Sequence, residues 1–122
     1  MQELFPISYW GRVPSELARY QEAAECGFTV VPGPPEALDL AHQAGIKLML
    51  HDPRIYAGMT ERPGWEADVQ AVVAAYAAHP ALWGYYITDE PSYHQFAALA
   101  QIVRAFEARD DRHVAYINLF PN

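Results

Sequence analysis

The sequence has few cysteines and few basic side chains. Cys26 is the only cysteine among 122 residues, which excludes a disulfide within the chain and a cysteine-rich zinc site. Lysine and arginine total 8 against 15 acidic residues, and the formal net charge is −7 at pH 7. Because a nucleic-acid surface needs clustered basic residues, we expect no nucleic-acid partner.

Long apolar runs are also lacking. No stretch approaches the roughly 20 apolar residues that cross a bilayer, so no membrane association is expected. No basic-then-apolar leader follows Met1, and no signal peptide is therefore expected in this chain. The sequence does not distinguish a cytoplasmic protein from a secreted protein whose leader has been removed.

Motifs of nucleotide binding and serine catalysis are absent too. No GxGxxG follows the first expected strand, and no GxxxxGK[ST] occurs anywhere. None of the serines lies in a GxSxG nucleophile elbow. These absences disfavour a dinucleotide-binding domain, a P-loop protein and a serine hydrolase, and we expect no cofactor.

The chain does have the composition of a packed globular domain. Hydrophobic residues make up 52% and charged residues 19%, and the length suits a single domain over residues 1–122. Apolar runs alternate with helical patterns along the whole chain. The expected strands lie near residues 5–10, 28–31, 46–51, 82–88 and 114–119, and the expected helices near 14–26, 35–44, 65–79 and 92–109. This β-α alternation predicts an α/β fold with about five parallel strands and four helices.

The stretch from Leu82 to Pro91 organises the rest. An apolar, aromatic strand pattern ends in Asp89, Glu90 and a proline that cannot continue it. Ser92 and Gln95 then have the spacing of a capping box, which predicts the start of a helix. The two acids therefore lie at the carboxyl end of a strand, which is the edge where α/β proteins bind ligands.

Glu90 is the lead catalytic candidate. A carboxyl group at a strand end beside aromatic walls can act as a general acid. An alternative of equal weight is that Asp89 or Glu90 stabilises the start of the following helix. Because neighbouring strand residues point to opposite faces, we expect Glu90 on the same face as Tyr86 and Asp89 on the helix side.

Other polar and aromatic residues follow the remaining strands. His51 ends the third expected strand, Asn118 lies in the last, and Trp10 ends the first. Each could contact a substrate, and each has an ordinary structural alternative. A metal site formed by His51, Asp52, Asp89 and Glu90 is disfavoured, because the HxH and HxxE spacings are missing.

Residues 79–91 (HPALWGYYITDEP) resemble the fourth-strand region of TIM-barrel glycoside hydrolases of the retaining clan-A type. Residues 44–50 (AGIKLML) and 114–121 (VAYINLFP) are also similar to that clan. The resemblance implies a partial (β/α)8 barrel in which Glu90 is the acid/base. Asp89 stands where the clan commonly has an asparagine that holds the substrate's 2-hydroxyl. Taken with the strand-end residues above, the expected substrate-binding residues are Asp89, His51, Tyr86, Asn118 and Trp10.

The resemblance also implies that the catalytic set is incomplete. In the clan the nucleophile ends strand seven, whereas five strands are expected here. We therefore expect a half-barrel with little or no hydrolase activity of its own, completed by a homodimer or by further sequence. The alternatives are a non-catalytic half-barrel that self-assembles or binds carbohydrate and, less favoured, a metal-dependent hydrolase.

Overall fold

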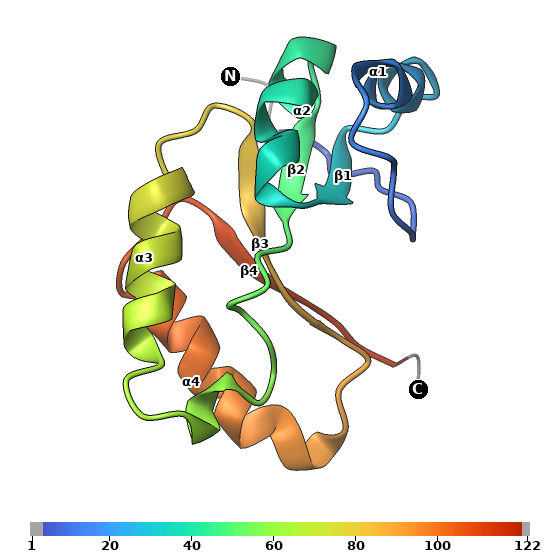
Figure 1. Cartoon of the computed structure of the whole chain (residues 1–122). Helices are drawn as coiled ribbons and strands as arrows, with labels where there is room; N and C mark the ends of the chain where they lie inside the picture. Colours follow the sequence, from blue (N-terminus) through green and yellow to red (C-terminus); the bar gives the residue numbers. More distant parts are fainter. Residues whose placement is uncertain (1–3, 121–122) are drawn as a thin grey trace.

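The computed structural model describes residues 4–120 and shows an α/β fold (Figure 1). Four parallel strands form one sheet in the order β1 (Val30–Gly33), β2 (Lys47–Leu50), β3 (Leu82–Asp89) and β4 (Val114–Asn118). The helices are α1 (Leu17–Glu25), α2 (Leu38–Ala44), α3 (Glu66–Tyr76) and α4 (Phe96–Glu107), and the short 3-10 turns are η1 (Pro35–Ala37), η2 (Met59–Glu61) and η3 (Tyr93–Gln95). The predicted parallel sheet with alternating helices is confirmed. No helix among residues 4–120 has the length and apolarity needed to cross a membrane.

The prediction of a fifth strand over residues 5–10 was wrong. This segment runs beside β1, where Ile7 O accepts a hydrogen bond from Thr29 N at 2.9 Å. The next bonds involve a side chain, because Thr29 Oγ1 accepts from Ile7 N at 2.8 Å and donates to Phe5 O at 2.7 Å. Pro6 has no N–H to offer a ladder, so a threonine hydroxyl holds the segment without extending the sheet.

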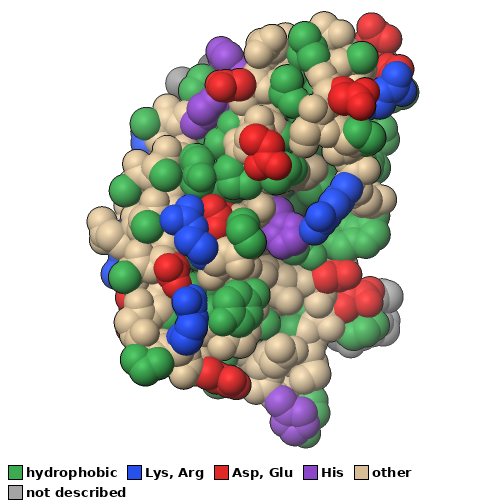
Figure 2. Space-filling model, viewed as in Figure 1, with side chains coloured by type: hydrophobic (Ala, Val, Ile, Leu, Met, Phe, Trp, Pro, Cys, Tyr) green, Lys and Arg blue, Asp and Glu red, His purple; other side chains and the backbone are tan. Residues whose placement is uncertain are grey.

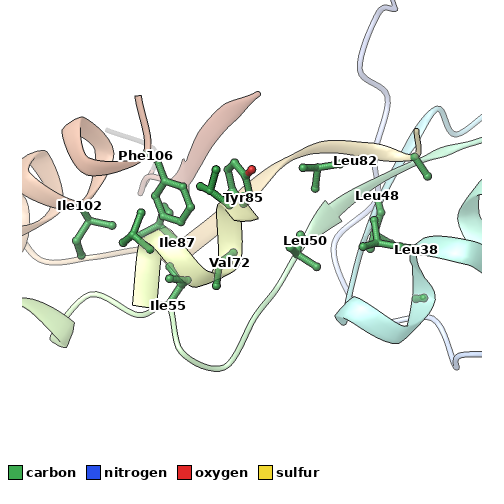
Figure 3. Packing of buried hydrophobic residues seen from close by; sticks show 14 of the residues in the cluster. Leu38, Leu48, Leu50, Ile55, Val72, Leu82, Tyr85, Ile87, Ile102 and Phe106 are labelled. Carbon is green, nitrogen blue, oxygen red and sulfur yellow. The ribbon is translucent and has the colours of Figure 1, made fainter. Parts of the chain in front are cut away.

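The core fills the space between the sheet and its helices (Figure 3). Tyr85 and Ile87 of β3 face this core, as predicted, and the Tyr85 ring stacks on Phe106 of α4 with centroids 4.4 Å apart. Burying one such large apolar side chain stabilises a fold by about 1.5–3 kcal/mol. The central side chains of this layer are Leu48, Leu50, Val72, Leu82, Tyr85, Ile87, Ile102 and Phe106.

The passage from β3 into α4 follows the predicted signals. Pro91 comes after the strand, and Ser92 and Gln95 form the expected capping box, in which Ser92 N donates to Gln95 Oε1 at 3.0 Å. The turn η3 then leads into α4. The cap of this helix is therefore supplied by Ser92 and Gln95 and not by the two acids before them.

Strand β3 is irregular at two points, and this decides which side chains share a face. Leu48 and Met49 of β2 align with Leu82 and Gly84, so Trp83 is an extra residue opposite β2. A second shift places Ile87 as an extra residue opposite β4. Each extra residue resets the alternation of side chains along the strand.

A buried polar network lies at the N-terminal end of β4. Asp110, in the turn before that strand, is 5% exposed. Its Oδ2 accepts a hydrogen bond from Tyr85 Oη at 2.6 Å and lies 2.7 Å from His113 Nδ1, and its Oδ1 accepts from Arg112 N at 3.1 Å. Burial pushes the Asp110 pKa upward, but these hydrogen bonds outweigh it and hold the pKa below its ordinary value.

Candidate functional site

Aromatic side chains form a layer on the face of the sheet opposite Tyr85 and Ile87. Tyr86 is its centre: the Tyr116 ring stacks on it at 6.2 Å, the His51 ring meets it edge-on at 5.0 Å, and Trp10 lies at 6.2 Å. Trp83 reaches Tyr116 at 6.1 Å, because the first irregularity of β3 turns it to this face. These rings are half-buried or exposed, so the layer offers an accessible aromatic surface.

Asp89 lies beside this layer and not on the helix side as we expected. Asn118 Nδ2 donates a hydrogen bond to Asp89 Oδ1 at 2.8 Å, and Tyr116 Oη lies 3.4 Å from Asn118 Oδ1. The cause is the extra residue Ile87, which turns Asp89 to the face that Tyr86 already occupies. Burial, together with the charge of Asp89 and the nearby Tyr116, raises the pKa of Tyr86 to about 12.

Glu90 follows β3 directly and is exposed. Its backbone is in the left-handed region, with φ at 41°, and its N–H donates to Asn118 O at 2.7 Å. A non-glycine residue in this conformation costs about 1–2 kcal/mol. Within residues 4–120 the Glu90 carboxylate accepts no hydrogen bond from the protein, so it is available to a ligand.

A cleft of about 890 Å³ opens next to the aromatic layer. Four parts of the chain line it: the loop after the first segment, the end of β1 with its following loop, the residues just after β2, and Tyr86 within β3. The lining includes Trp10, Arg12, Gly33, Glu36, His51 and Tyr86. Its size is within the range of small-molecule sites. On the face drawn in Figure 2, a histidine borders a basic side chain near the middle, with acidic side chains further down.

Two ionisable residues follow β2 at the edge of the cleft, and their surroundings set their charge. Burial and the nearby Arg12 charge lower the His51 pKa against the opposing effect of Asp52, so the imidazole is neutral at pH 7. Asp52 is buried and accepts two hydrogen bonds from the Arg54 guanidinium, at 2.8 and 2.7 Å. Burial raises the Asp52 pKa, but the hydrogen bonds and charge of Arg54 prevail and lower it. Asp52 therefore fixes its own loop.

The structure brings the expected site residues together in two groups. Trp10, His51 and Tyr86 border the cleft, and Asp89 and Asn118 form a hydrogen-bonded pair. The stack of Tyr86 on Tyr116 connects the groups, and Glu90 lies next to the pair.

Three residues of this region were not among the predicted site residues. Tyr116 is two residues from Asn118 on the same strand, so strand alternation could have found it. Trp83 depends on an irregularity of β3 that no sequence pattern marked. Arg12 lies in a loop that carried no signal.

The candidate metal ligands do not lie close together. In the described part of the chain, no three histidine, cysteine, aspartate or glutamate side chains lie close enough to hold a metal ion. His51, Asp52, Asp89 and Glu90 therefore do not form such a group.

No protein-family model matches the chain, and no curated protein matches it. Aromatic rings beside a carboxylate, an amide and a neutral imidazole can hold a polar ring-shaped ligand, because the rings cover its apolar faces while the polar groups bond its hydroxyls. A free carboxylate at the strand end can then exchange a proton with that ligand.

Proposed function

We propose that the chain is a glycoside-hydrolase-like half-barrel whose carboxyl-end face binds carbohydrate. The observation that carries this proposal is the aromatic layer of Tyr86, Tyr116 and Trp10, flanked by the Asp89–Asn118 pair. Sugar rings have apolar C–H faces and a rim of hydroxyl groups. Such a ligand suits a site that combines aromatic faces with paired polar groups.

Glu90 is the acid/base residue in this proposal. As a general acid it protonates the oxygen of the leaving sugar, and as a base it later accepts a proton from water. Retaining hydrolysis also needs a second carboxylate about 5–5.5 Å away, on the other side of the sugar. Asp89 adjoins Glu90 in sequence and is bonded to Asn118, so it does not fill that role. We therefore propose that the chain alone binds saccharide with little or no turnover.

Isothermal titration with neutral and acidic oligosaccharides tests the binding. The wild type should bind at least one of them, and Trp10→Ala should weaken that binding by about tenfold or more through loss of the aromatic contact. The matched control is Tyr93→Ala, because Tyr93 is 73% exposed, does not line the cleft, and contacts the ring of His94. Absence of binding across the panel, or equal loss in the control, would overturn the proposal.

Aryl glycosides test Glu90 separately. Any turnover by the wild type should disappear in Glu90→Gln, which keeps the size of the side chain and removes its acidity. Equal turnover by the two proteins would remove Glu90 from the mechanism.

A second candidate function, self-assembly, has its own observation. A groove of about 400 Å³ lies between α4 and β4, lined by apolar side chains together with Arg104 and Glu107. Two of the apolar lining residues, Leu119 and Phe96, are exposed. Neither Arg104 nor Glu107 joins an ion pair among residues 4–120. In an interface with two-fold symmetry, Arg104 of each copy can meet Glu107 of the other.

A charge exchange tests this assembly. Light scattering after size-exclusion chromatography should show a dimer for the wild type and a monomer for Arg104→Glu, in which like charges meet. The double variant with Arg104→Glu and Glu107→Arg should restore the dimer. A monodisperse wild-type monomer, or a double variant that stays monomeric, would contradict the two-fold arrangement.

A further inference from the structure

We infer that the saccharide bound in the cleft carries a carboxylate, and that Arg12 recognises it. This inference rests on the proposed carbohydrate function and specifies its substrate class as uronic-acid-containing sugars. Arg12 lines the cleft together with Trp10, His51 and Tyr86, and therefore lies beside the aromatic layer on which a sugar ring would pack.

Arg12 is free of polar contacts within residues 4–120. It forms no hydrogen bond and no ion pair with the residues that the structure describes, although Glu36 lines the same cleft. Arg54, one strand end away, is a clear contrast, because its guanidinium makes two hydrogen bonds to the carboxylate of Asp52. Arg54 is therefore held by a bidentate contact with a carboxylate, whereas the guanidinium of Arg12 is available to a ligand.

The surrounding groups favour a carboxylate on a sugar over a simple ion. The planar guanidinium presents paired N–H groups that match the two oxygens of a carboxylate. His51 is close enough for the Arg12 charge to affect it, and its neutral ring can bond a hydroxyl. Tyr86 and Trp10 supply the apolar contact that an isolated anion would not use.

The charge of the whole chain makes this arginine more significant. With a net charge of −7, the protein repels anions in general. Glu36 adds a negative group to the cleft itself, so an acidic sugar gains attraction only where its carboxylate meets Arg12. This predicts a single carboxylate at one end of the bound ligand and disfavours a densely charged polyanion.

The test uses oligosaccharide pairs of equal length that differ only at C6, one with hydroxymethyl groups and one with a terminal uronic acid. The wild type should bind the acidic member about tenfold more tightly, the size of one charge-assisted contact. Arg12→Gln should lose this preference and bind the two members with equal affinity. Arg19→Gln, a helix arginine paired with Glu22, is the matched control and should keep the preference.

Added salt and a sulfated sugar separate the remaining outcomes. The acidic preference of the wild type should fall as salt is raised, because the contact is electrostatic. Equal binding of both members by the wild type, retention of the preference in Arg12→Gln, or tighter binding of a sulfate ester than of the uronic acid would each overturn the inference. In those cases saccharide still binds and the proposed function stands, whereas failure to bind any saccharide would defeat both.

Discussion

Asn118 Nδ2 donates a hydrogen bond to Asp89 Oδ1 at 2.8 Å, and so joins the carboxyl ends of β3 and β4. The backbone carbonyl oxygen of Asn118 accepts a hydrogen bond from the backbone N–H of Glu90 at 2.7 Å. Asn118 therefore orients Asp89 with its side chain and Glu90 with its backbone. Both acids depend on the register of the last strand.

Asp89→Asn should leave the fold intact and strengthen saccharide binding. The new side chain keeps an oxygen that can accept the Asn118 amide and gains an N–H₂ donor beside the aromatic layer. We expect a change in unfolding free energy within about 0.5 kcal/mol and a several-fold gain in affinity for neutral sugars. Urea unfolding and titration calorimetry measure the two quantities. Weaker binding of neutral sugars would show that the Asp89 charge itself is needed.

Glu90→Gly should stabilise the protein while removing the candidate acid/base. Glycine adopts a φ of 41° without the steric cost that glutamate meets there, although it gains more freedom in the unfolded chain. We expect a net gain of up to about 1 kcal/mol in unfolding free energy. Glu90→Gln keeps the strained backbone and should show no such gain. A less stable glycine variant would mean that the glutamate side chain contributes to the fold.

Gly84→Ala should destabilise the sheet. A Cβ at this position would lie 2.5 Å from the carbonyl oxygen of Val114 and 2.6 Å from its Cγ2, and the backbone of β4 cannot move aside freely. We expect a loss of about 1–3 kcal/mol, typical of overpacking. Gly58→Ala is the control, because its nearest neighbour would be a Tyr56 ring carbon at 3.5 Å. Equal unfolding midpoints for the two variants in urea would contradict this close approach.

Asp110→Asn should remove part of the resistance to acid. The folded pKa of Asp110 lies below its unfolded value, so its contribution is fully present above about pH 4 and is lost as the pH falls through the folded pKa. At pH 7 we expect a loss of about 2–3 kcal/mol from weakened hydrogen bonds to a buried charge. The difference from the wild type should shrink steadily below pH 4.

The neighbouring Asp111 provides the control for that titration. It is exposed and adjoins Asp110 in sequence, so Asp111→Asn should change the unfolding free energy at pH 7 by less than about 0.5 kcal/mol. Urea unfolding at several pH values gives the comparison. A difference between Asp110→Asn and the wild type that stays constant down to pH 2 would contradict the assigned role of the carboxylate.

Local patterns predicted the alternation of strands and helices. The passage from β3 to α4 was predictable because Pro91, Ser92 and Gln95 act through nearby backbone groups. The burial of Tyr85 and Ile87 followed from alternation along one strand. These signals depend on neighbours in sequence and need no knowledge of the tertiary contacts.

The remaining features depend on contacts between distant segments. Residues 5–10 have a strand pattern, but the hydroxyl of Thr29 takes the bonds that a ladder would need. The side on which Asp89 lies follows from the irregular pairing of β3 with β4 at Ile87, which no local pattern reveals. The place of Arg12 at the cleft likewise depends on how a loop folds over β1 and β2.

Chemical-shift mapping with a bound oligosaccharide locates the saccharide-binding surface on the chain. The ¹⁵N-labelled chain is titrated with the sugar that binds best, and the perturbed amide and side-chain signals are assigned. We expect the largest changes around the cleft and the Asp89–Asn118 pair, at Trp10, His51, Tyr86, Asn118 and Glu90. Changes confined to the groove between α4 and β4, or no saturable changes with any saccharide, would contradict it.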